Sequence, residues 1–116
     1  VLRGGQHLPN YSSENVFYTV ELMKRLKLTP SVMVDCSHAN SMRNPLMQPK
    51  IMMNVVDQIR EGQNAICGVM LESYIKTGQQ DIAAAGKLIP GVSVTDPCLG
   101  WQETEEAILA AYEKLP

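Results

Sequence analysis

Residues 65–72 read Ala-Ile-Cys-Gly-Val-Met-Leu-Glu. The run up to Leu71 has no polar alternation, which predicts a β-strand buried on both faces, as in a parallel sheet. Glu72 follows directly, and a carboxylate at the end of a buried strand needs a cation or a hydrogen-bond network. This stretch therefore predicts an α/β fold with a functional carboxylate at the carboxyl end of a parallel strand.

Two further polar side chains also follow short apolar runs. His38 comes shortly after the run 31–35, and Asp96 comes shortly after 92–94. One βα unit spans about 30 residues, and the carboxyl ends of parallel strands converge on one face. We therefore expect His38, Glu72 and Asp96 to be neighbours, and an imidazole with two carboxylates suits Mn, Fe or Zn. Simpler roles stay open on the residues alone: a hydrogen-bonded loop histidine, and a turn aspartate before a proline.

Helical and strand patterns flank these positions. In chain order we expect the end of a strand at 1–2, a helix at 13–27, a strand at 31–35, a helix at 49–61, a strand at 65–71, a loop at 73–91 with turns at Thr77-Gly78 and Pro90-Gly91, a strand at 92–94 and a helix at 102–115. The last helix is expected to form its core face from Ile108, Leu109, Tyr112 and Leu115. Right-handed βα crossovers in this order build TIM barrels or doubly wound sheets.

The composition is that of a globular protein, with 45% hydrophobic and 19% charged residues in a chain of 116. A net charge of -2 and scattered Lys and Arg give no electrostatic footprint for nucleic acid. No apolar run approaches the roughly 20 residues that span a bilayer, so we expect no membrane partner. No basic-plus-apolar leader follows Val1, so we expect no signal peptide.

The chain has three cysteines, Cys36, Cys67 and Cys98, and no CxxC pair. An odd number of cysteines without paired spacing disfavours both a disulfide framework and a zinc knuckle. Reduced thiols indicate a cytoplasmic protein. We expect Cys67 to be buried and to act as a small hydrophobic residue.

The first five residues, Val1-Leu2-Arg3-Gly4-Gly5, read as the tail of a strand. The three further strand candidates are too few for an open parallel sheet covered by helices, so we expect part of a larger unit. Glycines let backbone approach a ligand closely, and a guanidinium is suited to clamp phosphate or carboxylate. On these residues alone, an Arg3 that only forms a salt bridge at a barrel rim is the favoured alternative.

Four motifs taken together resemble one family. They are Leu2-Arg3-Gly4-Gly5 followed by Pro9-Asn10-Tyr11-Ser12, then Asp35-Cys36-Ser37-His38-Ala39-Asn40-Ser41, Gly68-Val69-Met70-Leu71-Glu72-Ser73, and Thr95-Asp96-Pro97-Cys98-Leu99-Gly100-Trp101. In this order and spacing they are similar to the class I 3-deoxy-D-arabino-heptulosonate 7-phosphate (DAHP) synthases, the aromatic-amino-acid-regulated type of bacteria and yeast. The resemblance runs from Val1 to about Leu115, essentially the whole chain.

The resemblance implies a transferase that condenses phosphoenolpyruvate with erythrose 4-phosphate and releases phosphate, at the entry to the shikimate pathway and aromatic amino acid biosynthesis. The family fold is a (β/α)8 barrel, so residues 1–116 would form one partial TIM-barrel domain, about strands 6–8 with their helices, without the N-terminal half. Arg3 would be a catalytic and substrate-binding residue that contacts phosphoenolpyruvate. His38, Glu72 and Asp96 would bind a divalent metal (Mn, Fe, Zn or Co), and His38 would also be catalytic.

The departures from the family pattern limit what residues 1–116 can do alone. The family's fourth metal ligand is a cysteine on an early strand, and that position and the main anion-binding Arg and Lys residues precede this segment. None of the three cysteines here aligns with that ligand. The family's inhibitor site also lies mostly outside these residues, so they do not indicate which aromatic amino acid regulates the enzyme. We expect the isolated chain to be inactive and to form a homo-oligomer that covers its strand edges.

Two other hypotheses belong to different functional classes. One is a free-standing, non-catalytic remnant that associates through exposed strand edges. The other is a small metal-binding module with an unrelated activity.

Overall fold

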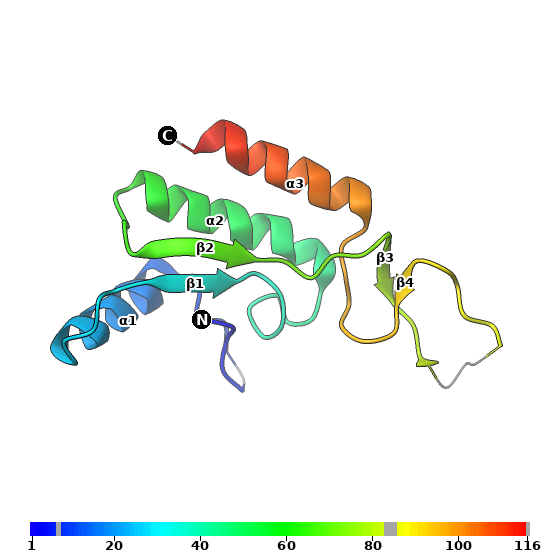
Figure 1. Cartoon of the computed structure of the whole chain (residues 1–116), viewed down its shortest axis with the longest axis horizontal. Helices are drawn as coiled ribbons and strands as arrows, with labels where there is room; N and C mark the ends of the chain where they lie inside the picture. Colours follow the sequence, from blue (N-terminus) through cyan, green and yellow to red (C-terminus); the bar gives the residue numbers. More distant parts are fainter. Residues whose placement is uncertain (7, 83–85, 116) are drawn as a thin grey trace.

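The computed structural model describes residues 1–6, 8–82 and 86–115. Its elements are α1 (Ser13–Arg25), β1 (Val32–Asp35), the 3-10 helix η1 (Pro45–Met47), α2 (Gln48–Arg60), β2 (Ile66–Met70), β3 (Lys76–Gln79), β4 (Val92–Ser93) and α3 (Trp101–Lys114) (Figure 1). The predicted α/β fold with parallel strands is confirmed. In the described part of the chain, no helix combines the length and apolar content that a bilayer span requires.

Strands β1 and β2 run parallel and bring their carboxyl ends to the same edge. Asp35, the last residue of β1, lies opposite Met70, the last residue of β2. On the other side of β1, Leu2 forms a single parallel bridge with Val34, and the Asp35 N–H donates to the Leu2 carbonyl at 2.8 Å. The chain start therefore joins this sheet in parallel, as expected, through one bridge rather than a full strand.

The main core lies on one face of the β1–β2 pair. Val32 and Val34 are two residues apart, so their side chains share a face. They pack in one buried cluster with Val16 and Val20 of α1 and with Val55 of α2. Burying each such side chain contributes about 1.5–3 kcal/mol. Helices α1 and α2 therefore cover the same face of the strands.

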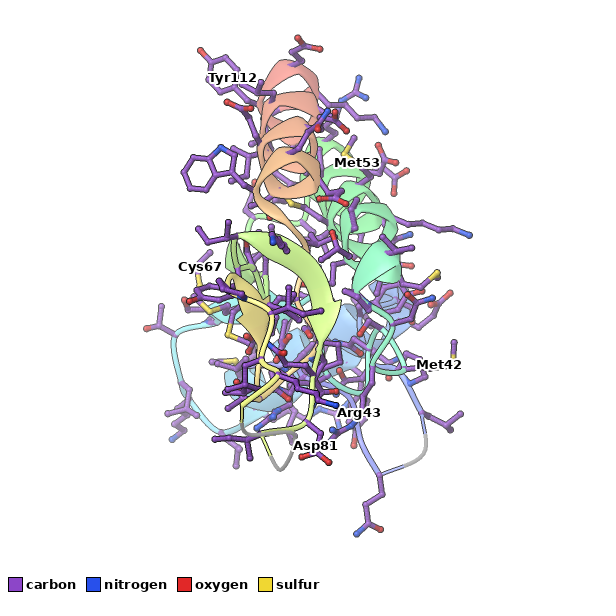
Figure 2. All side chains as sticks on the ribbon, turned by 90° about the vertical axis from the view of Figure 1, so that its right-hand side faces the viewer. Met42, Arg43, Met53, Cys67, Asp81 and Tyr112 are labelled. Carbon is purple, nitrogen blue, oxygen red and sulfur yellow. The ribbon has the colours of Figure 1, made fainter. Side chains whose placement is uncertain are left out.

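The buried side of α3 consists of small residues. Ala107 and Ala111, one helical turn apart, pack against α2, and Lys114 Nζ pairs with Asp57 Oδ1 of α2 at 2.6 Å. The prediction of a large apolar core face is wrong: the four predicted residues are exposed, namely Ile108 (50%), Leu109 (55%), Tyr112 (77%) and Leu115 (42%). Two alanines let α3 lie close to α2, as Figure 1 shows, and the larger side chains then face outward, as Figure 2 shows for Tyr112.

Strand β2 is covered on one face only. Ile66 is buried, whereas Cys67 is exposed and the residues from Gly68 to Leu71 are half-buried, so the predictions of a doubly buried strand and a buried Cys67 are wrong. The pairing passes from Ile66 opposite Val32 to Gly68 opposite Met33, which skips Cys67 and leaves it without a partner in β1. All three cysteines are free, as expected.

The segment 73–91 contains a strand that the sequence did not predict. Thr77-Gly78, expected to be a turn, lies inside β3, which pairs in parallel with β4. Its polar, glycine-containing sequence carries no strand pattern, so tertiary pairing decides its conformation. The turn at Pro90-Gly91 is present, because the Val92 N–H donates to the Ile89 carbonyl and Gly91 has a φ of 87°, which favours glycine. Residues 83–85 of the predicted loop lie outside the described residues.

Candidate metal centre

The loop after β1 fixes one imidazole. Asp35 is fully buried; its Oδ1 accepts the Ser37 N–H at 2.8 Å, and its Oδ2 lies 2.7 Å from His38 Nδ1. An ionised carboxylate only accepts hydrogen bonds, so Nδ1 carries the hydrogen of this contact. The imidazole is thereby oriented with Nε2 on the side away from Asp35. His38 itself has a φ of 48°, in the left-handed region, which turns the chain sharply after the strand.

Carboxylates from two other strand ends face His38 Nε2. Glu72 follows β2 and its Oε1 lies 3.7 Å from Nε2. Asp96 follows β4 and its Oδ2 lies 3.8 Å from Nε2. Three ligand atoms, one from each residue, all lie within 4.8 Å of one another. The structure therefore brings together the three residues that the strand-end rule selected, while their role as ligands stays a prediction.

These three residues fit a divalent metal in donor type, and the two separations from the His38 nitrogen fit one ion, while the whole group spans up to 4.8 Å. With metal–ligand bonds of about 2.1 Å, two ligands of one ion are at most about 4.2 Å apart. The distances from Nε2 to the two carboxylates satisfy this limit. Two carboxylates this close repel each other, and a bound cation relieves that repulsion. The side chains are partly open, at 14% for His38, 30% for Glu72 and 39% for Asp96, which leaves room for an exchangeable ligand.

Arg3 lies at the same edge of the sheet but outside this cluster. Its Nε is 4.0 Å from Asp35 Oδ2, and its side chain is 62% exposed. This contact is a long ion pair at a partly open rim. Asp35 is therefore a partner for the salt bridge that the sequence analysis gave as the alternative role of Arg3. The exposed remainder of the guanidinium is available to a second anion.

A hydrogen-bond network ties the Arg3 segment to the histidine loop. The Asn40 side chain donates to the carbonyls of Leu2 and Asp35 and accepts the Asn10 N–H. Gly4 has a φ of 84°, and a Cβ there would lie 2.6 Å from Ala39 Cβ. The glycine after Arg3 is therefore required by close packing against the loop that carries His38.

The two buried cysteines near the cluster are neutral thiols. Burial first, and then the charge of Asp35, raise the pKa of Cys36 to about 12. Burial is also the main cause that raises the pKa of Cys98, whose Sγ donates to the Asp96 carbonyl at 3.3 Å. A raised pKa disfavours the thiolate form of both residues.

Asp35 is a site residue that the sequence analysis treated only as the end of a strand. The available signal was an aspartate three positions before the histidine, at the point where the strand becomes a loop. Metal-binding histidines usually donate their other ring N–H to a carboxylate or carbonyl, which fixes the tautomer. The Asp35–His38 pair has this arrangement.

Several proteins similar to this chain in fold or sequence carry the name phospho-2-dehydro-3-deoxyheptonate aldolase. A solved structure of phospho-2-dehydro-3-deoxyheptonate aldolase from Francisella tularensis SCHU S4 matches 97% of this chain with a TM-score of 0.90 and 36% identity, and the match covers 33% of that chain. The tyrosine-inhibited enzyme of Schizosaccharomyces pombe is 43% identical over 108 residues, and the phenylalanine-inhibited enzyme of Saccharomyces cerevisiae is 42% identical over 115.

The family model described as the DAHP synthetase I family matches residues 1–109. The chain therefore belongs to the DAHP synthetase I family, as the four sequence motifs indicated. It spans 29% and 31% of the length of the two yeast relatives.

We predict that Asp35→Asn moves the imidazole proton of neutral His38 from Nδ1 to Nε2. The Ser37 N–H holds the amide oxygen, so the amide NH2 faces Nδ1 and donates to it. Long-range 1H–15N NMR of the imidazole would detect the change. Asp57→Asn, which alters the charge equally at the Lys114 pair, should leave the His38 signals unchanged. A wild-type His38 protonated on Nε2 alone would contradict this orientation.

Proposed function

We propose that this chain supplies the metal-binding end of a DAHP synthase, which condenses phosphoenolpyruvate with erythrose 4-phosphate and releases phosphate. The observation that carries the proposal is the convergence of His38, Glu72 and Asp96 at the carboxyl ends of three strands. Membership of the family and the names of the relatives support the reaction.

Within that protein we propose that residues 1–116 form one domain segment, the C-terminal portion of a (β/α)8 barrel with about strands 6–8. The parallel pairing of β1 and β2 supports this, as do helices α1 and α2 on one face of the strands. Catalytic groups of such barrels gather at the carboxyl ends of the strands. We also propose a cytoplasmic location, in keeping with free cysteines.

The proposed roles follow from the geometry of each side chain. His38 Nε2, Glu72 and Asp96 would hold a divalent metal, with Mn, Fe, Zn and Co all compatible with nitrogen and oxygen donors. When bound, such a metal supplies Lewis-acid polarisation of a carbonyl or activation of water. Asp35 orients His38, and the exposed guanidinium of Arg3 would bind the phosphoenolpyruvate anion beside it.

A metal titration tests the centre directly. We predict that the protein binds Mn2+ and that Glu72→Gln weakens binding by more than about tenfold, because even outer partners of a ligand typically contribute 10–100-fold. Free Mn2+ measured by electron paramagnetic resonance gives the dissociation constant. Glu61→Gln makes the same chemical change at an exposed position and should have no effect. Equal binding by all three proteins would refute the centre.

We predict that residues 1–116 expressed alone form no detectable DAHP from both substrates with Mn2+. By the family resemblance, Arg3 is the one matched clamp residue for the phosphorylated substrates in this segment. Positioning of reactants contributes roughly 7–11 kcal/mol of barrier reduction. The loss of most of the clamp should therefore lower the reaction rate severely. A discontinuous assay of DAHP measures this, and turnover like that of an intact enzyme would contradict the proposed division of the site.

We also predict that residues 1–116 expressed alone form a homo-oligomer. Helix α3 has four large side chains that are at least half exposed, namely Trp101, Ile108, Leu109 and Tyr112. Leaving a large apolar side chain exposed to solvent costs about 1.5–3 kcal/mol. In a complete barrel the remaining strands and helices would cover such surfaces. Sedimentation should show association that Leu109→Ser weakens and Glu113→Ser does not. A monodisperse monomer of 12.8 kDa would rule the prediction out.

A further inference from the structure

Gln48 is the first residue of α2, and both polar atoms of its side-chain amide form hydrogen bonds with the backbone of one residue, Glu72. The Glu72 N–H donates to Gln48 Oε1 at 2.8 Å, and Gln48 Nε2 donates to the Glu72 carbonyl at 3.1 Å. Gln48 is fully buried, and a buried amide is stable only where its donor and acceptor are satisfied. The side chain thus pairs with the backbone of Glu72 as a neighbouring strand would.

This pairing occurs beyond the end of the β1–β2 ladder. The β1–β2 ladder ends at Asp35 opposite Met70, with a last hydrogen bond from the Cys36 N–H to the Met70 carbonyl at 2.8 Å. Beyond it, the Glu72 carbonyl accepts the Leu99 N–H at 2.9 Å, but its N–H has only Gln48 as a partner among the described residues. Gln48 therefore replaces the missing ladder at the residue that carries a candidate ligand.

The position of the Glu72 backbone decides whether its carboxylate reaches the cluster. Glu72 Oε1 lies 3.7 Å from His38 Nε2, and functional groups must be held within about 0.5 Å of their productive geometry. The bridge to Leu99 holds the Glu72 carbonyl and also the Tyr74 N–H, which donates to the Leu99 carbonyl at 2.8 Å, but it offers no partner to the Glu72 N–H. Gln48 supplies that partner, and so fixes the peptide group that precedes the Glu72 side chain.

We infer that Gln48 is a positioning residue of the metal centre, which holds the Glu72 backbone so that the carboxylate can share one cation with His38 and Asp96. The inference rests on the proposed function. Gln48 would not touch the cation or a substrate; it acts through Glu72.

The same helix offers a matched control. Gln58 is also a buried glutamine of α2, and its Nε2 donates to the Tyr11 carbonyl at 2.8 Å and to Asn54 Oδ1 at 2.9 Å. Ten residues along a helix place it about 15 Å from Gln48. Replacing either glutamine by methionine removes a buried amide of the same size and its hydrogen bonds. Only the Gln48 change removes the partner of the Glu72 N–H.

The experiment measures Mn2+ dissociation constants of wild type, Gln48→Met and Gln58→Met, with thermal unfolding as the stability control. We expect Gln48→Met to weaken Mn2+ binding about 10–100-fold and Gln58→Met to leave it within about twofold of wild type. Co2+ at saturation should show altered visible absorption bands in Gln48→Met alone, which a general loss of stability would not produce. Gln48→Glu keeps an acceptor for the Glu72 N–H and, as the protonated acid, a donor for the Glu72 carbonyl, so it should give a smaller loss at a pH at which this buried acid is protonated.

The outcomes separate this inference from the proposed function. A wild-type protein that does not bind Mn2+ overturns the proposed function and the role of Gln48 with it. Wild-type binding that Gln48→Met leaves unchanged, or that both methionine variants weaken equally, overturns the role of Gln48 alone. If both Gln48 variants fail to fold while Gln58→Met folds, Gln48 is structural only and the inference is wrong.

Discussion

The buried carboxylate of Asp35 is the group on which the rest of the centre depends. A carboxylate with no exposed surface is costly unless it is hydrogen-bonded and paired. Asp35 meets this requirement with the Ser37 N–H, with His38 Nδ1 and, at longer range, with Arg3. One side chain at the end of β1 thus sets the loop, the imidazole and the guanidinium at once. Its own place is fixed by the backbone pairing of β1 with Leu2 and β2.

The sequence predicted the candidate site better than it predicted the surfaces of the fold. His38, Glu72 and Asp96 could be grouped because a parallel sheet brings strand ends together whatever the side chains are. The outward side of α3 could not be predicted, because Ala107 and Ala111 contact α2 and periodicity does not tell small buried residues from large exposed ones. The exposure of Cys67 could not be predicted either, because an apolar run does not show that only one face of its strand is covered.

Strand β3 shows a second limit of sequence patterns, and it matters for the site. Lys76–Gln79 has no apolar alternation, yet it pairs with β4, and Asp96 lies shortly after β4. The Gly78 N–H donates to the Cys98 carbonyl at 2.8 Å, and the Cys98 N–H donates to the Gly78 carbonyl at 3.1 Å. Asp96 therefore depends for its position on a segment whose structure is set by long-range pairing rather than by local propensity.

Two hydrogen-bond networks, joined at the end of the β1–β2 ladder, hold the two halves of the candidate centre. His38 belongs to the network of Asp35 and Asn40, whereas Glu72 is held by Leu99, three residues after Asp96, and by Gln48. Backbone pairing of Glu72 with Leu99 couples the two carboxylates, and backbone pairing of Cys36 with Met70 couples the histidine loop to β2. The covalent loop from His38 to Gln48 joins the halves, since it begins at the imidazole and ends at the amide that holds Glu72. This loop, with its turns at Ser41 and Arg43 closed onto Ser37 and His38, acts together with the β1–β2 ladder to place the nitrogen donor beside the oxygen donors.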